Sequence, residues 1–275
     1  MAAAAVNATR LLLPPLLLLL ATAVRAAPTP KAVDCDVVVA GGSTASLAAA
    51  IATATAYGSL SVCLTDPTDW LGGQMTASAV SAIDFGHRAP DDMSKSFTDL
   101  LHALGSPTNP GECWVSSMCY QPTTLLREYI EPTLAALPNL RVFNNTVITS
   151  TVPCAAEREG GATGANPKPG HGGARSGAGG TICALKAVQR STRDTRAGAG
   201  WSQLLSESIQ DWYAPAPSAA FEKTVLVLSG KVFIDATEFG DVLVTGAATK
   251  LRLPVVQGVE ETAEASSRMD DKCGA

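Results

Sequence analysis

Two features have residue types that suggest a binding chemistry: a glycine turn and a single carboxylate. Each follows the end of an apolar run. Residues 35–40 end at Gly41-Gly42, and residues 60–65 end at Asp66. Bare backbone after a strand lets a diphosphate reach the first amides of the following helix, and a carboxylate about twenty residues later accepts hydrogen bonds from ribose hydroxyls. The spacing predicts a site for the adenosine diphosphate part of a dinucleotide.

The glycine fingerprint of such sites is incomplete here. Its three positions fall on Gly41, Ser43 and Ser46, of which only the first is glycine. Small serine side chains still suit the place, and a hydroxyl is able to donate to phosphate. Two plain alternatives stay open: an ordinary strand–turn–helix, and an Asp66 that merely opens a solvated turn over 66–69.

The surrounding elements predict an α/β fold. The β-branched run 35–40 is typical of a parallel strand covered on both faces, and the alanine-rich 45–56 and apolar 60–65 complete a βαβ unit. A second helix is expected at 122–137, bent at Pro132. The further expected strands are 140–143, 146–149, 182–188 and a hairpin of 224–228 with 231–235. Together they predict a Rossmann-like parallel sheet with an inserted β-meander.

The ends and one internal segment differ from this pattern. Residues 1–26 lack acidic side chains and carry an apolar run before small residues, which predicts a signal peptide and a secreted or lumenal protein with no membrane contact after cleavage. A membrane anchor and an organelle transit peptide are the alternatives. Residues 27–31 read as a linker, 27–275 as one domain, and the glycine-rich 157–180 as a disordered loop.

Charge and cysteine content narrow the function. The net charge is −5 with 20 scattered lysines and arginines, so nucleic acid is not an expected partner. The seven cysteines form no CxxC pair and predict no metal site. Cys113 and Cys119 are the expected disulfide, whereas Cys35 and Cys63, inside apolar runs, are expected to be buried free thiols.

Several ordered motifs resemble a known family. They are 36–42 (DVVVAGG), 70–74 (WLGGQ), 113–116 (CWVS), 211–213 (DWY) and 232–241 (VFIDATEFGD). The chain resembles FAD-dependent oxidoreductases grouped with xanthan lyase-like flavoproteins, within the glutathione-reductase-like superfamily.

The resemblance implies FAD as cofactor, an unknown small-molecule substrate, and roles for particular residues. It places Gly41, Gly42, Ser43 and Ser46 at the pyrophosphate, Asp66 at the ribose, Gly72, Gly73 and Gln74 on the flavin side, Val147 at adenine, and Ala236, Thr237, Gly240 and Asp241 near the cofactor. For Asp241 a helix N-cap is the alternative. Trp114, Trp212 and Tyr213 either line a substrate pocket or pack. No catalytic base is identified.

Members of that family usually continue well beyond position 275, so the resemblance implies a member with its C-terminal portion missing. The expected function is that of an FAD-dependent oxidoreductase. A truncated, non-catalytic fragment that binds only nucleotide or a partner is the alternative. An NAD-dependent dehydrogenase, which uses the same fingerprint and ribose carboxylate, is a third.

Overall fold

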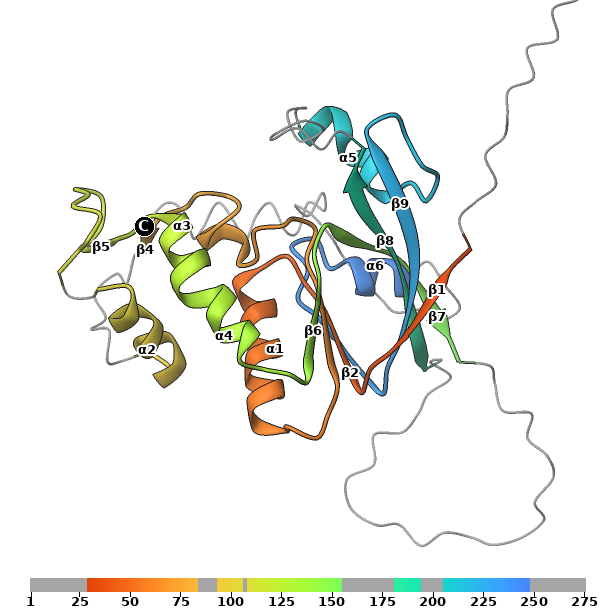
Figure 1. Ribbon diagram of the computed structural model, residues 1–275, viewed down its shortest axis with the longest axis horizontal. Coiled ribbons are helices and arrows are strands. Elements are labelled where there is room, and N and C mark those ends of the chain that lie inside the picture. The colour runs from red at the N-terminus through yellow and green to blue at the C-terminus, as the bar shows by residue number, and fades with distance from the viewer. Residues whose placement is uncertain (1–28, 84–92, 106–107, 155–180, 194–204, 248–275) are drawn as a thin grey trace, which may run out of the picture.

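The computed structural model describes residues 29–83, 93–105, 108–154, 181–193 and 205–247 of the chain (Figure 1). The predicted signal peptide at 1–26 and the predicted disordered loop at 157–180 lie outside these ranges. The predicted single domain 27–275 extends beyond them at both ends.

A four-stranded parallel sheet carries the predicted βαβ unit. Its strand order is β10 (Val232–Asp235), β2 (Val37–Ala40), β3 (Val62–Thr65) and β6 (Leu140–Phe143), and every neighbouring pair is parallel. The helix α1 (Thr44–Ala56) connects β2 to β3. This arrangement confirms the predicted Rossmann-like α/β sheet.

A second four-stranded sheet lies beside the first (Figure 1). The strands β7 (Thr146–Pro153), β8 (Ile182–Thr192) and β9 (Phe221–Ser229) pair antiparallel in chain order, which is the predicted β-meander. The strand β1 (Lys31–Asp34) pairs parallel with β9 at its edge. Part of this strand falls where the sequence predicted only a linker at 27–31.

The predicted hairpin of 224–228 with 231–235 is wrong, because β9 and β10 belong to different sheets. The chain crosses from one sheet to the other at Ser229-Gly230, and β1 and β2 cross beside it at Asp34–Val37. The Cys35 amide donates to the Ser229 carbonyl at 3.0 Å. A Cβ on Gly230 would lie 2.9 Å from Cγ2 of Val38, so the two crossing segments require bare backbone there.

Successive side chains of the central strand β2 enter two different cores. Val37 and Val39 pack with Leu47 of α1, whereas Val38 packs between the sheets with Leu228. This alternation follows from the two-residue period of a strand. The parallel sheet is therefore covered on both faces, as the continuous apolar run predicted.

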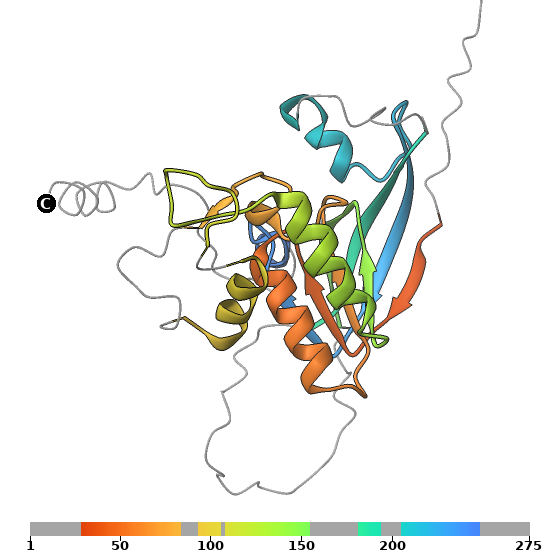
Figure 2. The same cartoon turned by 60° about the vertical axis from the view of Figure 1, so that its left-hand side comes forward.

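The second helical segment contains a π turn. It runs as α3 (Pro122–Thr124), the π-helical η3 (Leu125–Ile130) and α4 (Glu131–Ala135), and it lies beside α1 over the same face of the sheet (Figure 2). The Glu131 amide donates five residues back to the Leu126 carbonyl. Pro132 has no amide hydrogen to continue an α-helical ladder, so the irregularity lies directly before it.

The remaining elements are short. They are η1 (Gly73–Met75), β4 (Ala82–Ile83), α2 (Lys95–Ala103), β5 (Met118–Cys119), α5 (Leu205–Tyr213) and α6 (Asp241–Ala247). The sequence analysis predicts no element at α2. Among the described helices, none is both long and apolar enough to cross a lipid bilayer.

Three disulfides join described cysteines: Cys35–Cys63, Cys113–Cys119 and Cys154–Cys183. The predicted Cys113–Cys119 bond is confirmed, with a Cα–Cα distance of 6.0 Å. The prediction of free thiols at Cys35 and Cys63 is wrong. Cys63 pairs with Val38 in the parallel sheet. Cys35 lies three residues before Val38, in the connection from β1 to β2, and the fold therefore brings the two sulfurs together.

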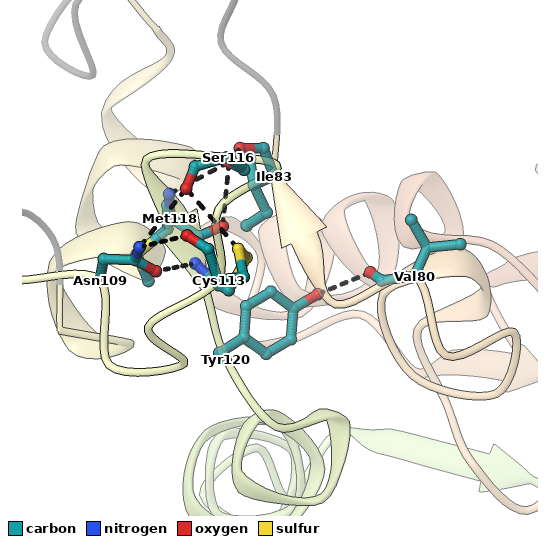
Figure 3. The surroundings of a disulfide bond; sticks show 8 residues. Val80, Ile83, Asn109, Cys113, Ser116, Met118 and Tyr120 are labelled. Carbon is teal, nitrogen blue, oxygen red and sulfur yellow. Dashed lines mark hydrogen bonds between the residues drawn. A yellow bond between two sulfur atoms is a disulfide. The ribbon is translucent and has the colours of Figure 1, made fainter.

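The Cys113–Cys119 loop is closed by a small hydrogen-bond network (Figure 3). The side chain of Asn109 donates to the Cys113 carbonyl and accepts from the Cys119 amide. Trp114, at the tip of the loop, is 95% exposed. Its suggested role as a pocket-lining aromatic finds no support in this position.

Candidate functional site

A cavity of about 490 Å³ opens where the carboxyl ends of β2, β3 and β10 meet the start of β7. Ligands of open α/β sheets bind at this edge. The lining residues come from five segments far apart in sequence: Gly41, Gly42, Pro67, Thr68, Asp69, Gly73, Ala77, Ser78, Asn145, Thr146, Val147, Ile148, Ile209, Trp212, Tyr213, Thr237, Glu238, Phe239 and Asp241.

The turn after β2 requires glycine at both positions. A Cβ on Gly41 would lie 2.2 Å from the Thr65 carbonyl oxygen, and Gly42 has a φ of +134°. Thr44 and Ala45, the first helical residues of α1, have no intrahelical acceptor for their amides. Gly41 and Gly42 thus present bare backbone to the cavity, directly before the amide end of a 13-residue helix whose first residues, Thr44 and Ala45, line the groove beside α1.

The two serines of the fingerprint do not offer their hydroxyl protons to the cavity. The Ser43 hydroxyl donates to the Ala236 carbonyl at 2.7 Å and accepts from the Ser46 amide. The Ser46 hydroxyl donates to the Ser43 carbonyl at 2.6 Å, and this side chain is fully buried. Together they cap α1, so the prediction that Ser46 faces a pyrophosphate is wrong, and Ala236 serves as the acceptor for Ser43.

The Gly72-Gly73 pair packs against the glycine turn. A Cβ on Gly73, whose φ is +55°, would lie 2.5 Å from the Gly42 carbonyl oxygen and 2.8 Å from the Ser43 Cα. Gly73 also lines the cavity, whereas Gly72 and Gln74 do not. Gly72 instead lines a separate apolar groove beside α1. The pair therefore braces the turn, and only its second glycine reaches the predicted cofactor side.

Asp66 lies at the end of β3 with only one carboxylate oxygen satisfied. Oδ1 accepts from the amide and the hydroxyl of Thr68, each at 2.9 Å. Oδ2 is buried and has no partner in the part of the chain that the structure describes. Burial raises the pKa of this carboxyl to about 6, against the hydrogen bonds from Thr68. A buried acceptor without a donor fits a hydroxyl-bearing ligand.

The segment after β10 forms another wall. Thr237, Glu238, Phe239 and Asp241 line the cavity, and Gly240 turns the chain with a φ of +67°. Asp235 accepts from the Thr237 amide in the turn and from the Leu243 amide, a donor in the first turn of α6. The alternative role of Asp241 as the cap of this helix is wrong, because Asp241 is its first residue and accepts from the Tyr213 hydroxyl at 3.1 Å.

The far wall comes from the start of β7 and from α5. Val147 lines the cavity where the resemblance placed adenine, next to Asn145. Ile209, Trp212 and Tyr213 face it from α5, a helix the sequence analysis did not predict. The sequence did not predict this helix, because residues 194–204, which precede it, show no helical spacing of apolar residues. Trp212 and Tyr213 thus line this cavity, and their role toward a substrate stays a prediction.

The charged side chains that line the cavity all have one sign. Its charged lining residues are Asp69, Glu238 and Asp241, and burial raises the pKa of Asp241. No lysine or arginine belongs to the described lining. A diphosphate in this cavity would meet backbone amides and the helix end rather than cationic side chains. Among the described residues, no group of three potential metal ligands comes together.

Comparison with known proteins agrees with the turn and the carboxylate. Residues 36–166 match the family model described as FAD dependent oxidoreductase. No curated protein matches the sequence.

Solved structures resemble the chain only distantly. L-proline dehydrogenase from P. horikoshii is 12% identical, with 75% of this chain and 23% of that chain covered and a TM-score of 0.29. E. coli quinol fumarate reductase is 12% identical over 75% and 33% of the two chains, with a TM-score of 0.34. THI4 of Thermovibrio ammonificans is 13% identical over 86% and 90%, also with a TM-score of 0.34.

The chain thus spans a third or less of the first two proteins, and at these TM-scores neither likeness bears on the site. The family match rests on the segment that holds the glycine turn, Asp66 and Gly73. Over residues 36–166, the chain is similar to the FAD-dependent oxidoreductases, and this match indicates FAD as the cofactor.

Proposed function

We propose that the chain binds the ADP half of FAD in the cavity at the ends of β2 and β3, as the nucleotide-binding part of an oxidoreductase acting on a small molecule. FAD, when bound, supplies the redox chemistry. The chain's own residues hold the nucleotide: the Gly41-Gly42 turn with the first amides of α1 binds phosphate, and Asp66 accepts ribose hydroxyls.

The observation that carries the proposal is the buried, unpartnered Oδ2 of Asp66. A carboxylate oxygen without a donor in a buried place costs free energy, and a ribose hydroxyl would remove that cost. Asp66 is buried and is not itself a lining residue, but it directly precedes Pro67 and Thr68, which line the cavity. It also follows Thr65, whose hydroxyl accepts a hydrogen bond from the Gly41 amide in the glycine turn. The residues present therefore fit a ribose flanked by phosphate.

The test is calorimetric titration of the full chain with ADP and with FAD, for the native sequence and Asp66→Asn. The variant is expected to bind both about 10-fold or more weakly, because the neutral amide is a poorer acceptor. Asp99→Asn is the matched control, since Asp99 is an exposed residue of α2 paired with Lys95. Equal affinities of native protein and Asp66→Asn would refute the ribose role.

Nicotinamide and flavin dinucleotides share the ADP half, so a second titration separates them. FAD is expected to bind more tightly than NAD, because the family match is to flavoproteins. Tighter binding of NAD would favour a dehydrogenase instead. Binding of ADP with no further gain from the flavin half would favour a nucleotide-binding, non-catalytic fragment.

We further propose that the protein folds in an oxidising compartment, as a secreted or lumenal protein does. Three disulfides among the described cysteines support this, since such bonds are rare where glutathione keeps thiols reduced. Mass spectrometry of the protein from its native source, alkylated before reduction, tests the proposal. Free thiols at all six positions would contradict it.

A further inference from the structure

The helix α1 has an apolar face that is exposed. None of its 13 residues carries a charge. Ala45, Ala48, Ala52 and Ala56 are exposed, and their spacing of three or four residues places them on one face of the helix. A helix that is apolar on all sides is normally buried on all sides. This face therefore calls for a partner that the described residues do not provide.

The exposed face forms one wall of the groove beside α1, which has a volume of about 600 Å³. Leu47, Leu125 and Ile130 are the buried apolar residues of the groove, and Phe97 of α2 and Tyr129 of η3 add two aromatic rings to its lining. None of the described lining residues is charged. A groove of this size and chemistry suits large apolar side chains rather than a charged ligand.

The disulfide loop between Cys113 and Cys119 has the opposite feature, an apolar tip that faces solvent. Trp114 is 95% exposed and Val115 is 57% exposed. Single exposed apolar residues are common, but tryptophan is highly buried on average. An indole with almost no contact to its own chain suits an anchor for another surface, where tryptophan often carries much of the binding energy.

The loop holds this tip in a fixed position (Figure 3). Besides the disulfide, the Gly111 amide donates to the Cys119 carbonyl at 2.8 Å, and the Ser116 hydroxyl donates to the Ile83 carbonyl. A preorganised tip loses less conformational entropy on binding than a flexible one. The loop is therefore suited to enter a preformed groove.

The loop and the groove lie on the same side of the molecule. Tyr120, which follows Cys119, donates through its hydroxyl to the Met75 carbonyl at 3.1 Å, and Met75 lines the groove. The strand β5, at the base of the loop, lies with α2 and α1 toward the end of the molecule away from the β7–β8–β9 sheet (Figure 1). In a dimer with a two-fold axis beside this end, each loop would face the groove of the other copy.

We propose that this side is the interface of a homodimer, in which Trp114 and Val115 of each copy enter the groove beside α1 of the other. By symmetry the contact occurs twice. An indole buries about 150–250 Å² and the facing groove a similar area, so the two contacts together bury roughly 600–1,000 Å². This is below the usual range of stable interfaces, so we expect a dimer that dissociates at micromolar concentrations. The proposal concerns assembly and does not depend on the nucleotide site.

Analytical ultracentrifugation of the full chain, from about 1 to about 200 µM, tests the proposal. The native protein is expected to change from monomer to dimer over this range. Trp114→Ala should weaken the dimer about 100-fold or more, because each dimer loses two buried indoles. Ala52→Glu, which places a charge on the exposed wall of the groove, should weaken it as strongly.

Each variant has a matched control. Phe239→Ala removes another exposed aromatic side chain, one that lines the nucleotide cavity and not the groove. Lys186→Glu changes the charge at an exposed position of β8, in the second sheet. Both controls should dimerise like the native protein.

A mixture of the two variants distinguishes a loop in a groove from other modes of association. Trp114→Ala retains a native groove, and Ala52→Glu retains a native loop. One of the two contacts can therefore form between them, so the mixture should associate more tightly than either variant alone. A dimer in which α1 packs against α1 would be broken by Ala52→Glu, left intact by Trp114→Ala, and not restored by mixing.

Three results would overturn the proposal: a native protein that stays monomeric up to about 200 µM, a dimer that Trp114→Ala leaves intact, or a mixture that associates no better than either variant. Thermal melts then identify the occupant of the groove. If the native protein is monomeric and Ala52→Glu lowers its melting temperature while Lys186→Glu does not, another segment of the same chain covers the groove and the homodimer proposal is wrong.

Discussion

Cys35, just before β2, is bonded to Cys63 in the middle of β3, across a sequence separation of 28 residues. The bond closes the whole βαβ unit, including α1 and the glycine turn, into one loop. Cys63 is fully buried and Cys35 is 9% exposed. The disulfide therefore lies between the two sheets, where it joins the crossing segment to the parallel sheet.

The double variant Cys35→Ala/Cys63→Ala should lose about 3–4 kcal/mol of unfolding free energy, because a loop of this length restricts the unfolded chain. The smaller loop closed by Cys113 and Cys119 gives the control, with an expected loss of about 2 kcal/mol in the corresponding double alanine variant. Urea denaturation under non-reducing conditions measures both. A smaller loss for the Cys35–Cys63 pair than for the control pair would contradict the loop-entropy account.

Gly73→Ala should damage both stability and nucleotide binding. The added Cβ would lie 2.5 Å from the Gly42 carbonyl oxygen, and the φ of +55° is strained for alanine. An unfolding free energy lower by about 1–3 kcal/mol is expected. Gly58→Ala is the matched control, since nothing lies within 4 Å of its added Cβ. If the two variants have the same melting temperature and the same ADP affinity, the glycine turn accommodates a Cβ at position 73 and the prediction is wrong.

The sequence predicts some elements of the site and not others. It predicts the βαβ unit, because β2 and β3 are continuous apolar runs and the turn glycines directly follow β2. The predicted hairpin at Ser229-Gly230 is wrong, because the local sequence does not distinguish two strands that pair with each other from two strands that belong to different sheets. The buried Cys35 and Cys63 were misjudged for a similar reason: their pairing depends on the crossing of β1 into β2.

The side chains of the site show the same division. The position of Asp66 follows from its place after a buried strand. The roles of Ser43 and Ser46 do not, because their hydroxyls have backbone partners that only the fold brings near, such as the Ala236 carbonyl. Asn145, whose buried Oδ1 atom has no partner among the described residues, carries no sequence signal, since an asparagine in a turn is common and the unpartnered oxygen is a property of the packing.

The stability of the nucleotide-free protein should depend on Asp66 through pH. Burial raises the folded-state pKa of Asp66 to about 6 from the ordinary value of 3.8. Between these two values the folded protein holds a proton that the unfolded chain releases, so this group's contribution to stability increases as the pH falls from about 6 to about 4. Above pH 6 the buried charge costs roughly 2–3 kcal/mol.

Asp66→Asn removes that charge, so the variant should gain in stability relative to the native protein at pH 7.5, and the gain should shrink at pH 4.5. Urea denaturation at the two pH values, without nucleotide, measures the difference. Asp99→Asn, at an exposed position, should show no such pH dependence. A stability difference between Asp66→Asn and the native protein that stays constant with pH would refute the shifted pKa.

Glu238→Gln should tighten the binding of ADP. Glu238 lines the cavity, and its Oε1 lies 3.0 Å from the position that a Cβ on Gly73 would take, so its negative charge is close to the glycine turn that is proposed to hold phosphate. Like charges several ångströms apart at a protein surface repel by about 1 kcal/mol, which corresponds to an affinity gain of roughly 3- to 10-fold on removal of the charge. The gain should diminish in 0.5 M salt, because the Debye length falls to about 4 Å.

Adenosine, which carries no phosphate, should bind the native protein and the Glu238→Gln variant equally. Glu128→Gln, on the exposed side of the π-helical segment, is the control and should leave ADP affinity unchanged. Weaker ADP binding by Glu238→Gln, or an equal effect on adenosine and ADP, would contradict the prediction. Glu238 would then contact the nucleoside rather than repel the phosphate, and phosphate could no longer be assigned to the glycine turn.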